Sequence, residues 1–384
     1  MIKWRIGRSI EVVFFTSMAF LALQWLVGYP TTVQGAVAHL PVASEKPLIP
    51  EAALPQVIAT LQFTPGIGIE PSDIGVNPNT GLIYVANSGS NNVSIVSGTH
   101  VVTNVAVGKS PYGVGVNPTT GYVYVTNRSD NTISVISKTT VVATLPTGQQ
   151  PTQVGVNPAT GYVYVTNWTS NTVTVLKETE VIATLSVARS PDTIGVNPVT
   201  GYVYVGGVNS SEVTVLSGTN VITTVHVGGS PKAIGANPNT GYVYVAHYPS
   251  DGTGLAVISG TQVVTSLLPL GASIYRCDVT VNPKNNDVFV LNGGYLSVIS
   301  RTDIITSVPV AYGAVAVVVN PTTGYAYVAN EYPGSVDVFS VTQAVNTIAA
   351  GEVVQALAVN PPQAMTMLEI VPAMMSLSLL GQNM

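Results

Sequence analysis

The dipeptide Asn-Pro recurs along the chain at an almost constant interval, and this feature limits the possible folds more than any other. It stands at residues 77, 117, 157, 197, 237, 282, 320 and 360, so the intervals are 40, 40, 40, 40, 45, 38 and 40 residues. A period of this length is typical of solenoids and β-propellers, in which each repeat is one supersecondary unit. The chain is therefore expected to be an array of one structural unit.

One unit, residues 111–148, divides into four short strands separated by turns. The pattern predicts strands at 113–116, 122–126, 132–136 and 141–145. Pro118 ends the first strand because proline lacks the N–H group that a sheet ladder needs. Gly121 can adopt the positive φ that closes the turn after it. Each unit is thus expected to form a four-stranded antiparallel sheet.

Both faces of the second strand are apolar, which predicts a sheet packed between two neighbours. Tyr122 and Tyr124 point to one side, and Val123 and Val125 point to the other. Only 8% of the residues are charged, against about 25% in typical soluble proteins. Four antiparallel strands in a unit of about 40–45 residues form the blade of a β-propeller, so the fold class is all-β.

The second strand also carries a family resemblance. The tetrapeptide Tyr-Val-Thr-Asn stands at 124–127 and again at 164–167, and Tyr-Val-Ala-Asn stands at 84–87 and 327–330. The chain resembles the YVTN family of β-propeller repeat proteins over residues 56–360. This resemblance implies a propeller in an extracytoplasmic setting, and it implies no single activity. The chain departs from the pattern at Gly206-Gly207 and at His247.

The number of blades depends on two fragments outside the seven complete units. Residues 57–62 resemble a fourth strand, and residues 355–360 resemble a first strand. An eighth blade would combine 355–359, 365–370 and 375–380 with the N-terminal strand 57–62, which would remove two free sheet edges. Eight blades are favoured for this reason, and seven blades are the alternative because residues 362–384 lack the turn chemistry of the repeat.

The first residues differ from the repeat and indicate export. Lys3, Arg5 and Arg8 precede an apolar run at 12–28, and small residues at 36 and 38 suit a signal peptidase. We interpret 1–38 as a secretory signal, 39–55 as a linker and 56–384 as one propeller domain. An uncleaved membrane anchor is the alternative for the N-terminal segment. The protein is expected to be secreted or associated with the cell surface or envelope.

The best candidate for a binding site is the channel mouth, where the loops before the first strands gather. These positions vary although the repeat is otherwise monotonous, and loops on a rigid ring commonly carry binding residues. The candidate ligand-binding residues are Asp73, Tyr112, Gln153, Asp192, Lys232, Tyr275, Arg276 and Asp278. The recurrent Asn at the end of the second strand, by contrast, is expected to have a structural role in every blade.

Several classes of chemistry have no signal in the sequence. The four histidines have no metal-ligand spacing, so no metal, cofactor or catalytic residue is assigned. The lone Cys277 has no His partner and is expected to be an inert thiol. The formal net charge of −5 disfavours nucleic acid as a partner.

Three functional hypotheses remain. The favoured one is an exported, non-catalytic binding or scaffold module whose partner is a protein, a glycan or a small molecule. The second is a hydrolase or lactonase-like enzyme that uses Asp73, Asp192 and Asp278, whose carboxylates would have to lie within about 5–9 Å of one another. The third is a purely structural component of a surface layer. Enzymatic activity is therefore uncertain, and its absence is favoured.

Overall fold

The computed structural model describes residues 56–62, 70–98, 100–248, 253–267, 270, 277–292, 294–311, 313–330, 335–340, 343–349, 357–359, 367–371 and 376–381. All of these belong to one compact unit, Pro50–Met384. The expected signal segment 1–38 and linker 39–55 lie outside the described residues, as do Tyr275 and Arg276. Within the described part of the chain, no helix is long and apolar enough to cross a membrane.

Seven antiparallel sheets of four consecutive strands, β2–β5 through β26–β29, follow the repeat units, and we number them blades 1 to 7. The inner strands are β2 (Pro71–Val76), β6 (Pro111–Val116), β10 (Pro151–Val156), β14 (Pro191–Val196), β18 (Ser230–Ala236), β22 (Cys277–Val281) and β26 (Ala314–Val319). The second strands are β3 (Ile83–Asn87), β7 (Tyr122–Asn127), β11 (Tyr162–Asn167), β15 (Val203–Gly207), β19 (Tyr242–Tyr248), β23 (Asp287–Asn292) and β27 (Tyr325–Asn330).

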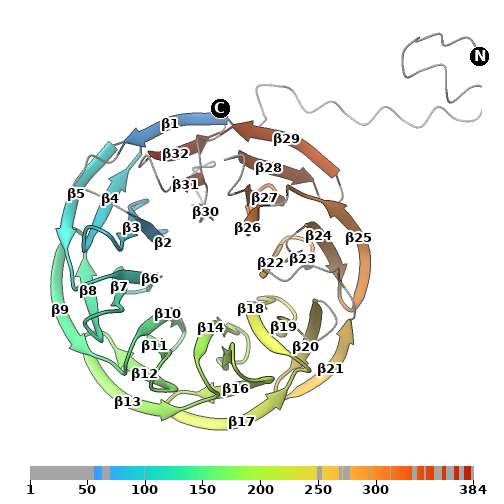
Figure 1. Cartoon of the computed structure of the whole chain (residues 1–384), viewed down its shortest axis with the longest axis horizontal. Coiled ribbons are helices and arrows are strands. Elements are labelled where there is room, and N and C mark those ends of the chain that lie inside the picture. Colours follow the sequence, from blue (N-terminus) through green and yellow to red (C-terminus); the bar gives the residue numbers. More distant parts are fainter. Residues whose placement is uncertain are drawn as a thin grey trace, which may run out of the picture. The chain divides into compact units, whose positions relative to one another are not determined.

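The outer half of each blade consists of a third strand and an edge strand. The third strands are β4 (Asn92–Ser97), β8 (Thr132–Ser137), β12 (Thr172–Lys177), β16 (Glu212–Ser217), β20 (Gly254–Ser259), β24 (Tyr295–Ser300) and β28 (Ser335–Ser340). The edge strands are β5 (His100–Ala106), β9 (Thr140–Pro146), β13 (Glu180–Ser186), β17 (Asn220–His226), β21 (Gln262–Leu267), β25 (Asp303–Pro309) and β29 (Gln343–Ala349). The blades are arranged radially, and consecutive inner strands contact one another (Figure 1). The four-stranded propeller blade predicted from the sequence is confirmed.

The expectation of eight blades needs correction. The antiparallel blades built from the repeat number seven, and residues 362–384 lack the Asn-Pro-x-Thr-Gly turn that would make an eighth copy. The remaining strands form a four-stranded sheet of different make, in the order β1-β32-β31-β30: β1 (Gln56–Gln62), β30 (Leu357–Val359), β31 (Met367–Val371) and β32 (Ser376–Gly381). In this composite sheet β1 pairs antiparallel with β32, and β30 contacts β26 and β2.

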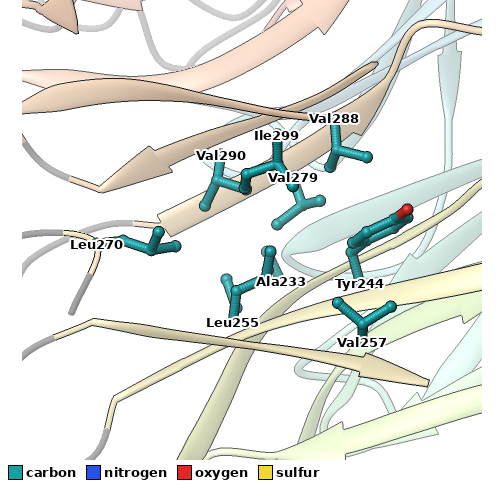
Figure 2. Packing of buried hydrophobic residues seen from close by; sticks show 10 residues of the cluster. Ala233, Tyr244, Leu255, Val257, Leu270, Val279, Val288, Val290 and Ile299 are labelled. Carbon is teal, nitrogen blue, oxygen red and sulfur yellow. The ribbon is translucent and has the colours of Figure 1, made fainter. Parts of the chain in front are cut away.

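The core lies between the blades. The second strands are buried on both faces, as the sequence predicts, and Tyr84, Tyr124, Tyr164 and Tyr204 are fully buried. Figure 2 shows one such layer, in which Tyr244 and Leu255 of blade 5 pack with Val279 and Val288 of blade 6. Burying each of these apolar side chains contributes about 1.5–3 kcal/mol, so the blade-to-blade layers are the main source of stability.

The Asn-Pro turns lie on the face of the ring opposite the channel mouth, and they stabilise that face. In blade 2, Oδ1 of Asn117 accepts the N–H groups of Thr119 and Thr120 at 2.9 and 3.2 Å, and Gly121 has φ +74°. In four blades the Nδ2 of this Asn also donates to the glycine carbonyl of the next blade's turn: Asn77 to Gly121, Asn157 to Gly201, Asn197 to Gly241 and Asn282 to Gly324. The repeated dipeptide therefore closes its own turn and ties neighbouring blades together.

Candidate functional site

The face opposite these turns, which we call the mouth face, carries the loops that lead into the inner strands. In blades 1 to 4 the residue before the first proline has a positive φ: Glu70, Ser110, Gln150 and Ser190, at 51–53°. Three of these residues are held by an Asn side chain of the preceding blade. The N–H of Ser110 donates to Asn91, that of Gln150 to Asn131 and that of Ser190 to Asn171, each at 2.8 Å. The mouth face is thus a rigid support for the side chains it presents.

Asp73 and Asp278, two of the predicted site residues, serve as links between blades. Oδ1 of Asp73 accepts the N–H of Ile74, and Oδ2 accepts the N–H of Val114 in blade 2, both at 2.8 Å. Asp278 repeats this arrangement toward Val317 of blade 7 at 2.9 Å. Burial raises the pKa of both carboxyls, to about 6 for Asp73, although the two backbone hydrogen bonds oppose the shift. Each carboxylate is therefore occupied by backbone donors.

A group of charged and aromatic side chains on the mouth face contains three further predicted residues. The guanidinium of Arg128 lies 5.1 Å from the ring centroid of Tyr112, and the ammonium of Lys232 lies 5.5 Å from that of Tyr248. The quadrupole of an aromatic ring attracts a cation that lies over it, and this attraction is worth about 0.5–1 kcal/mol at exposed sites. Two cations with fixed positions therefore stand on this face.

Asp192 connects these two cations electrostatically. Burial raises the pKa of its carboxyl to about 6, and Arg128, Lys232 and a hydrogen bond with Thr152 limit the rise. Arg128 comes from blade 2, Asp192 from blade 4 and Lys232 from blade 5. The propeller thus brings together charges that are more than 100 residues apart in the sequence.

Beside this group the surface is hollowed. Tyr112 and Arg128 line a cavity of about 400 Å³ together with Glu70, Ser88, Ser110, Ser129 and Gln150. A second cavity of about 380 Å³ shares Arg128, Ser129 and Gln150 with the first and continues to Asn131, Gln149 and Thr169. The lining side chains carry hydroxyl, amide or charged groups, and both hollows are open to solvent.

Arg128, Ser129 and Gln150 were not among the residues selected from the sequence. They lie in the turn after the second strand and in the loop before the first, whereas the sequence selection concentrated on the inner strand itself. One signal was available, because Arg128 is the only basic residue directly after a second strand in the seven units. Gln153 was selected and is partly exposed at the start of β10, where its N–H donates to Thr166 Oγ1 at 2.9 Å.

The single cysteine has the properties of an inert thiol, as predicted. Burial raises the pKa of Cys277 to about 11, although interactions with Tyr248 and Thr253 oppose the rise. The thiolate that nucleophilic catalysis needs is therefore scarce at neutral pH. His247 is buried and its pKa is lowered to about 4, chiefly by desolvation, so the ring stays neutral. Among the residues that the structure describes, no three His, Cys, Asp or Glu side chains gather to hold a metal.

Comparison with known proteins supports the fold and leaves the role open. No family model matches the chain, and no curated protein matches its sequence. Dihydro-heme d1 dehydrogenase NirN is similar in structure, with a TM-score of 0.65 and 14% identity, over 81% of this chain and 73% of that one.

Two further solved structures give the same result. Hydrazine synthase of Kuenenia stuttgartiensis matches with a TM-score of 0.57 and 17% identity, over 72% of this chain and 96% of its own. Virginiamycin B lyase of Staphylococcus aureus matches with a TM-score of 0.57 and 13% identity, over 71% and 95%. At such low identity these likenesses show a shared β-propeller fold, which hosts many unrelated functions.

Proposed function

We propose that the chain is an exported YVTN-type β-propeller that binds a ligand on its mouth face and performs no reaction there. One observation carries this proposal: Arg128, stacked on Tyr112 at 5.1 Å, lines two neighbouring hollows on the mouth face. Asp192 of blade 4 interacts electrostatically with Arg128 and with Lys232 of blade 5. Only 8% of the residues are charged, so charges gathered beside a polar cavity favour recognition over a merely solvated surface.

Binding is favoured over hydrolysis because the acidic residues are unsuited to acid–base work. Asp73 and Asp278 each accept two backbone N–H groups, one of them from the neighbouring blade. These hydrogen bonds hold both carboxylates in place as links between blades, which accounts for their positions without a catalytic role. This leaves Asp192 as the one carboxylate of the expected trio without a backbone donor among its interactions, and a single carboxylate supplies no acid–base pair.

Export is supported by the sequence before residue 39. When the protein is produced with its own leader, the mature chain is expected to begin at His39 and to be recovered outside the cytoplasm. N-terminal sequencing of the purified protein measures this. A soluble cytoplasmic product that begins at Met1 would contradict the export part of the proposal and leave the binding part standing.

Binding is tested with an array of glycans, peptides and small metabolites, followed by titration of each hit. Asp192→Asn and Lys232→Gln are expected to change the affinity of a true ligand at least about threefold, whereas Lys177→Gln should not. Lys177 is the matched control because its ammonium also lies over a tyrosine ring, that of Tyr162 at 5.7 Å, but at the opposite end of the blade. Hits that bind all variants equally would contradict a site on the mouth face.

The affinity should also depend on pH. Since the pKa of Asp192 is raised to about 6, its carboxyl is charged at pH 7.5 and mostly neutral at pH 5. When Asp192 is neutral, it no longer offsets the positive charges of Arg128 and Lys232. A ligand anion should therefore bind more tightly at pH 5 and a ligand cation more weakly, by about three- to tenfold. Asp192→Asn should abolish the step near pH 6, and an unchanged pH profile in this variant would exclude Asp192 from the site.

A further inference from the structure

We infer that the ligand is a carboxylated glycan chain, which lies in the two joined cavities of blades 1 to 3 and places a carboxylate on Arg128. This inference rests on the proposed binding at the mouth face and names the class of ligand. It rests on the arrangement of the two cavities, the chemistry of their lining and the position of the Arg128 guanidinium.

The shape favours a chain. The two cavities, of about 400 and 380 Å³, share Arg128, Ser129 and Gln150 in their linings, so they are adjacent, and we call the pair the groove. Ser88 follows the second strand of blade 1, whereas Thr169 follows that of blade 3, so the groove crosses two blade boundaries. A groove made of two consecutive sites, each large enough for a small molecule, suits an oligomer better than a compact metabolite.

The lining favours a hydroxyl-rich ligand. Serine, threonine, glutamine and asparagine supply both donors and acceptors, and none of the described residues that line the two cavities is aliphatic. The hydroxyls are already positioned: Ser129 Oγ donates to Ser110 Oγ, and Thr169 Oγ1 donates to Gln150 Oε1, both at 2.8 Å. Hydroxyl groups that donate and accept at once match the hydroxyl groups of a sugar. Tyr112 contributes its aromatic ring to the first cavity, with Arg128 over it at 5.1 Å.

The charge favours a carboxylate on that glycan. Arg128 lines both cavities, its guanidinium lies over the Tyr112 ring at 5.1 Å, and it interacts electrostatically with Asp192 of blade 4. A planar guanidinium with five N–H donors matches a carboxylate in a bidentate manner. Among the other acids of this region, Asp130 accepts the N–H of Lys109 at 2.8 Å, and the charge of Asp192 is shared between Arg128 and Lys232.

Glu70 is the unfavourable member of the groove and provides an internal check. It lines the first cavity, is exposed, and bears the same charge as the ligand proposed here. A like charge close to a bound anion weakens binding. If a carboxylated glycan occupies the groove, neutralising Glu70 should strengthen binding, while neutralising Arg128 should weaken it.

An acidic peptide is the competing macromolecule, and the groove fits it less well. Peptides gain affinity by pairing with a sheet edge or by placing apolar side chains in pockets. Apart from Tyr112 of β6, the described lining residues lie in turns and loops next to the inner and second strands, and none of them is aliphatic. The experiment therefore includes an acidic peptide as a direct competitor.

The test titrates the full chain with an oligogalacturonate, with the same oligomer as its methyl ester, and with oligoglutamate, by calorimetry at pH 7.5. The oligogalacturonate is expected to bind at least about tenfold more tightly than the ester. Arg128→Gln should reduce its affinity at least about tenfold, Arg128→Lys should reduce it less, and Glu70→Gln should raise it about two- to fivefold. Lys177→Gln should bind as the wild type does, and melting curves confirm that each variant is folded.

The outcomes separate the two proposals. Equal binding of the acid and its ester, or preferential binding of oligoglutamate, would overturn the carboxylated glycan. If another class of ligand binds and Asp192→Asn or Lys232→Gln alters that binding, the glycan inference fails while the mouth-face site stands. If no array ligand responds to any mouth-face variant, both fail.

Discussion

Replacing Gly207 with alanine is expected to lower the free energy of unfolding by at least about 2 kcal/mol, the scale of forced overpacking. A Cβ atom at this position would lie 2.0 Å from the carbonyl oxygen of Arg189 and 2.9 Å from its carbonyl carbon. Both are backbone atoms, so the strain cannot be relieved by a side-chain rotation. The loop 187–190 would have to move away from blade 4.

A loss of stability on replacing Gly207 is the opposite of what the repeat pattern suggests. Gly207 stands where five of the other six units carry Asn, so a consensus substitution, Gly207→Asn, would appear to be an improvement. In blade 4 the hydroxyl of Thr214 accepts the N–H of Ala188 at 3.0 Å, as that of Thr174 accepts the N–H of Gly148 in blade 3. Because any Cβ atom at position 207 meets the carbonyl of Arg189, Gly207→Asn should be at least as damaging as Gly207→Ala.

Chemical denaturation of the two variants measures the effect, with Gly294→Ala as the control. A Cβ atom on Gly294 would meet no other atom within 4 Å, so this variant should unfold like the wild type. Unchanged stability of Gly207→Asn would show that the loop adapts at little cost and that the close approach to Arg189 is unimportant.

Local chemistry explains why so much of the fold was predictable. The strands expected at 113–116 and 122–126 are observed as Pro111–Val116 and Tyr122–Asn127, because proline, glycine and alternating apolar residues act on the backbone within a few residues. The composite sheet was harder to judge. Its strands come from both ends of the chain and lack the repeat's turns, so matching the two end fragments to the repeat favoured an eighth blade where seven follow the unit.

The candidate site was only partly predictable because its properties arise between blades. The sequence presented Asp73 and Asp278 as carboxylates at the channel mouth, but their partners Val114 and Val317 are 41 and 39 residues away. Backbone donors have no signature in a sequence. Arg128 was overlooked for the opposite reason, since a charged residue in a polar turn is usually solvated, and only the structure places it over Tyr112 and beside two cavities.

The second large effect is expected at the recurrent Asn of the second strand. Nδ2 of Asn167 donates to Thr172 Oγ1 at 3.1 Å and to Thr174 Oγ1 at 2.9 Å, and the Asn side chain is fully buried. In Asn167→Ala both hydrogen bonds are lost within the blade. Since each buried polar group left without its partner costs about 1–3 kcal/mol, we expect a loss of about 1–3 kcal/mol in unfolding free energy.

Asn127 of the preceding blade allows a sharper form of this test, because it adjoins the proposed ligand site. Its Nδ2 donates to Thr132 Oγ1 and Ser134 Oγ at 2.9 and 3.0 Å. In a double-mutant cycle, Asn127→Ala and Ser134→Ala should couple by about 0.5–1.5 kcal/mol, because the second change removes a partner that the first has already left unbonded. A folded Asn127→Ala variant should retain Arg128-dependent ligand binding. If this variant lost binding while its stability equalled that of the wild type, the Asn would be a ligand contact, and the structural role assigned to it in every blade would be wrong.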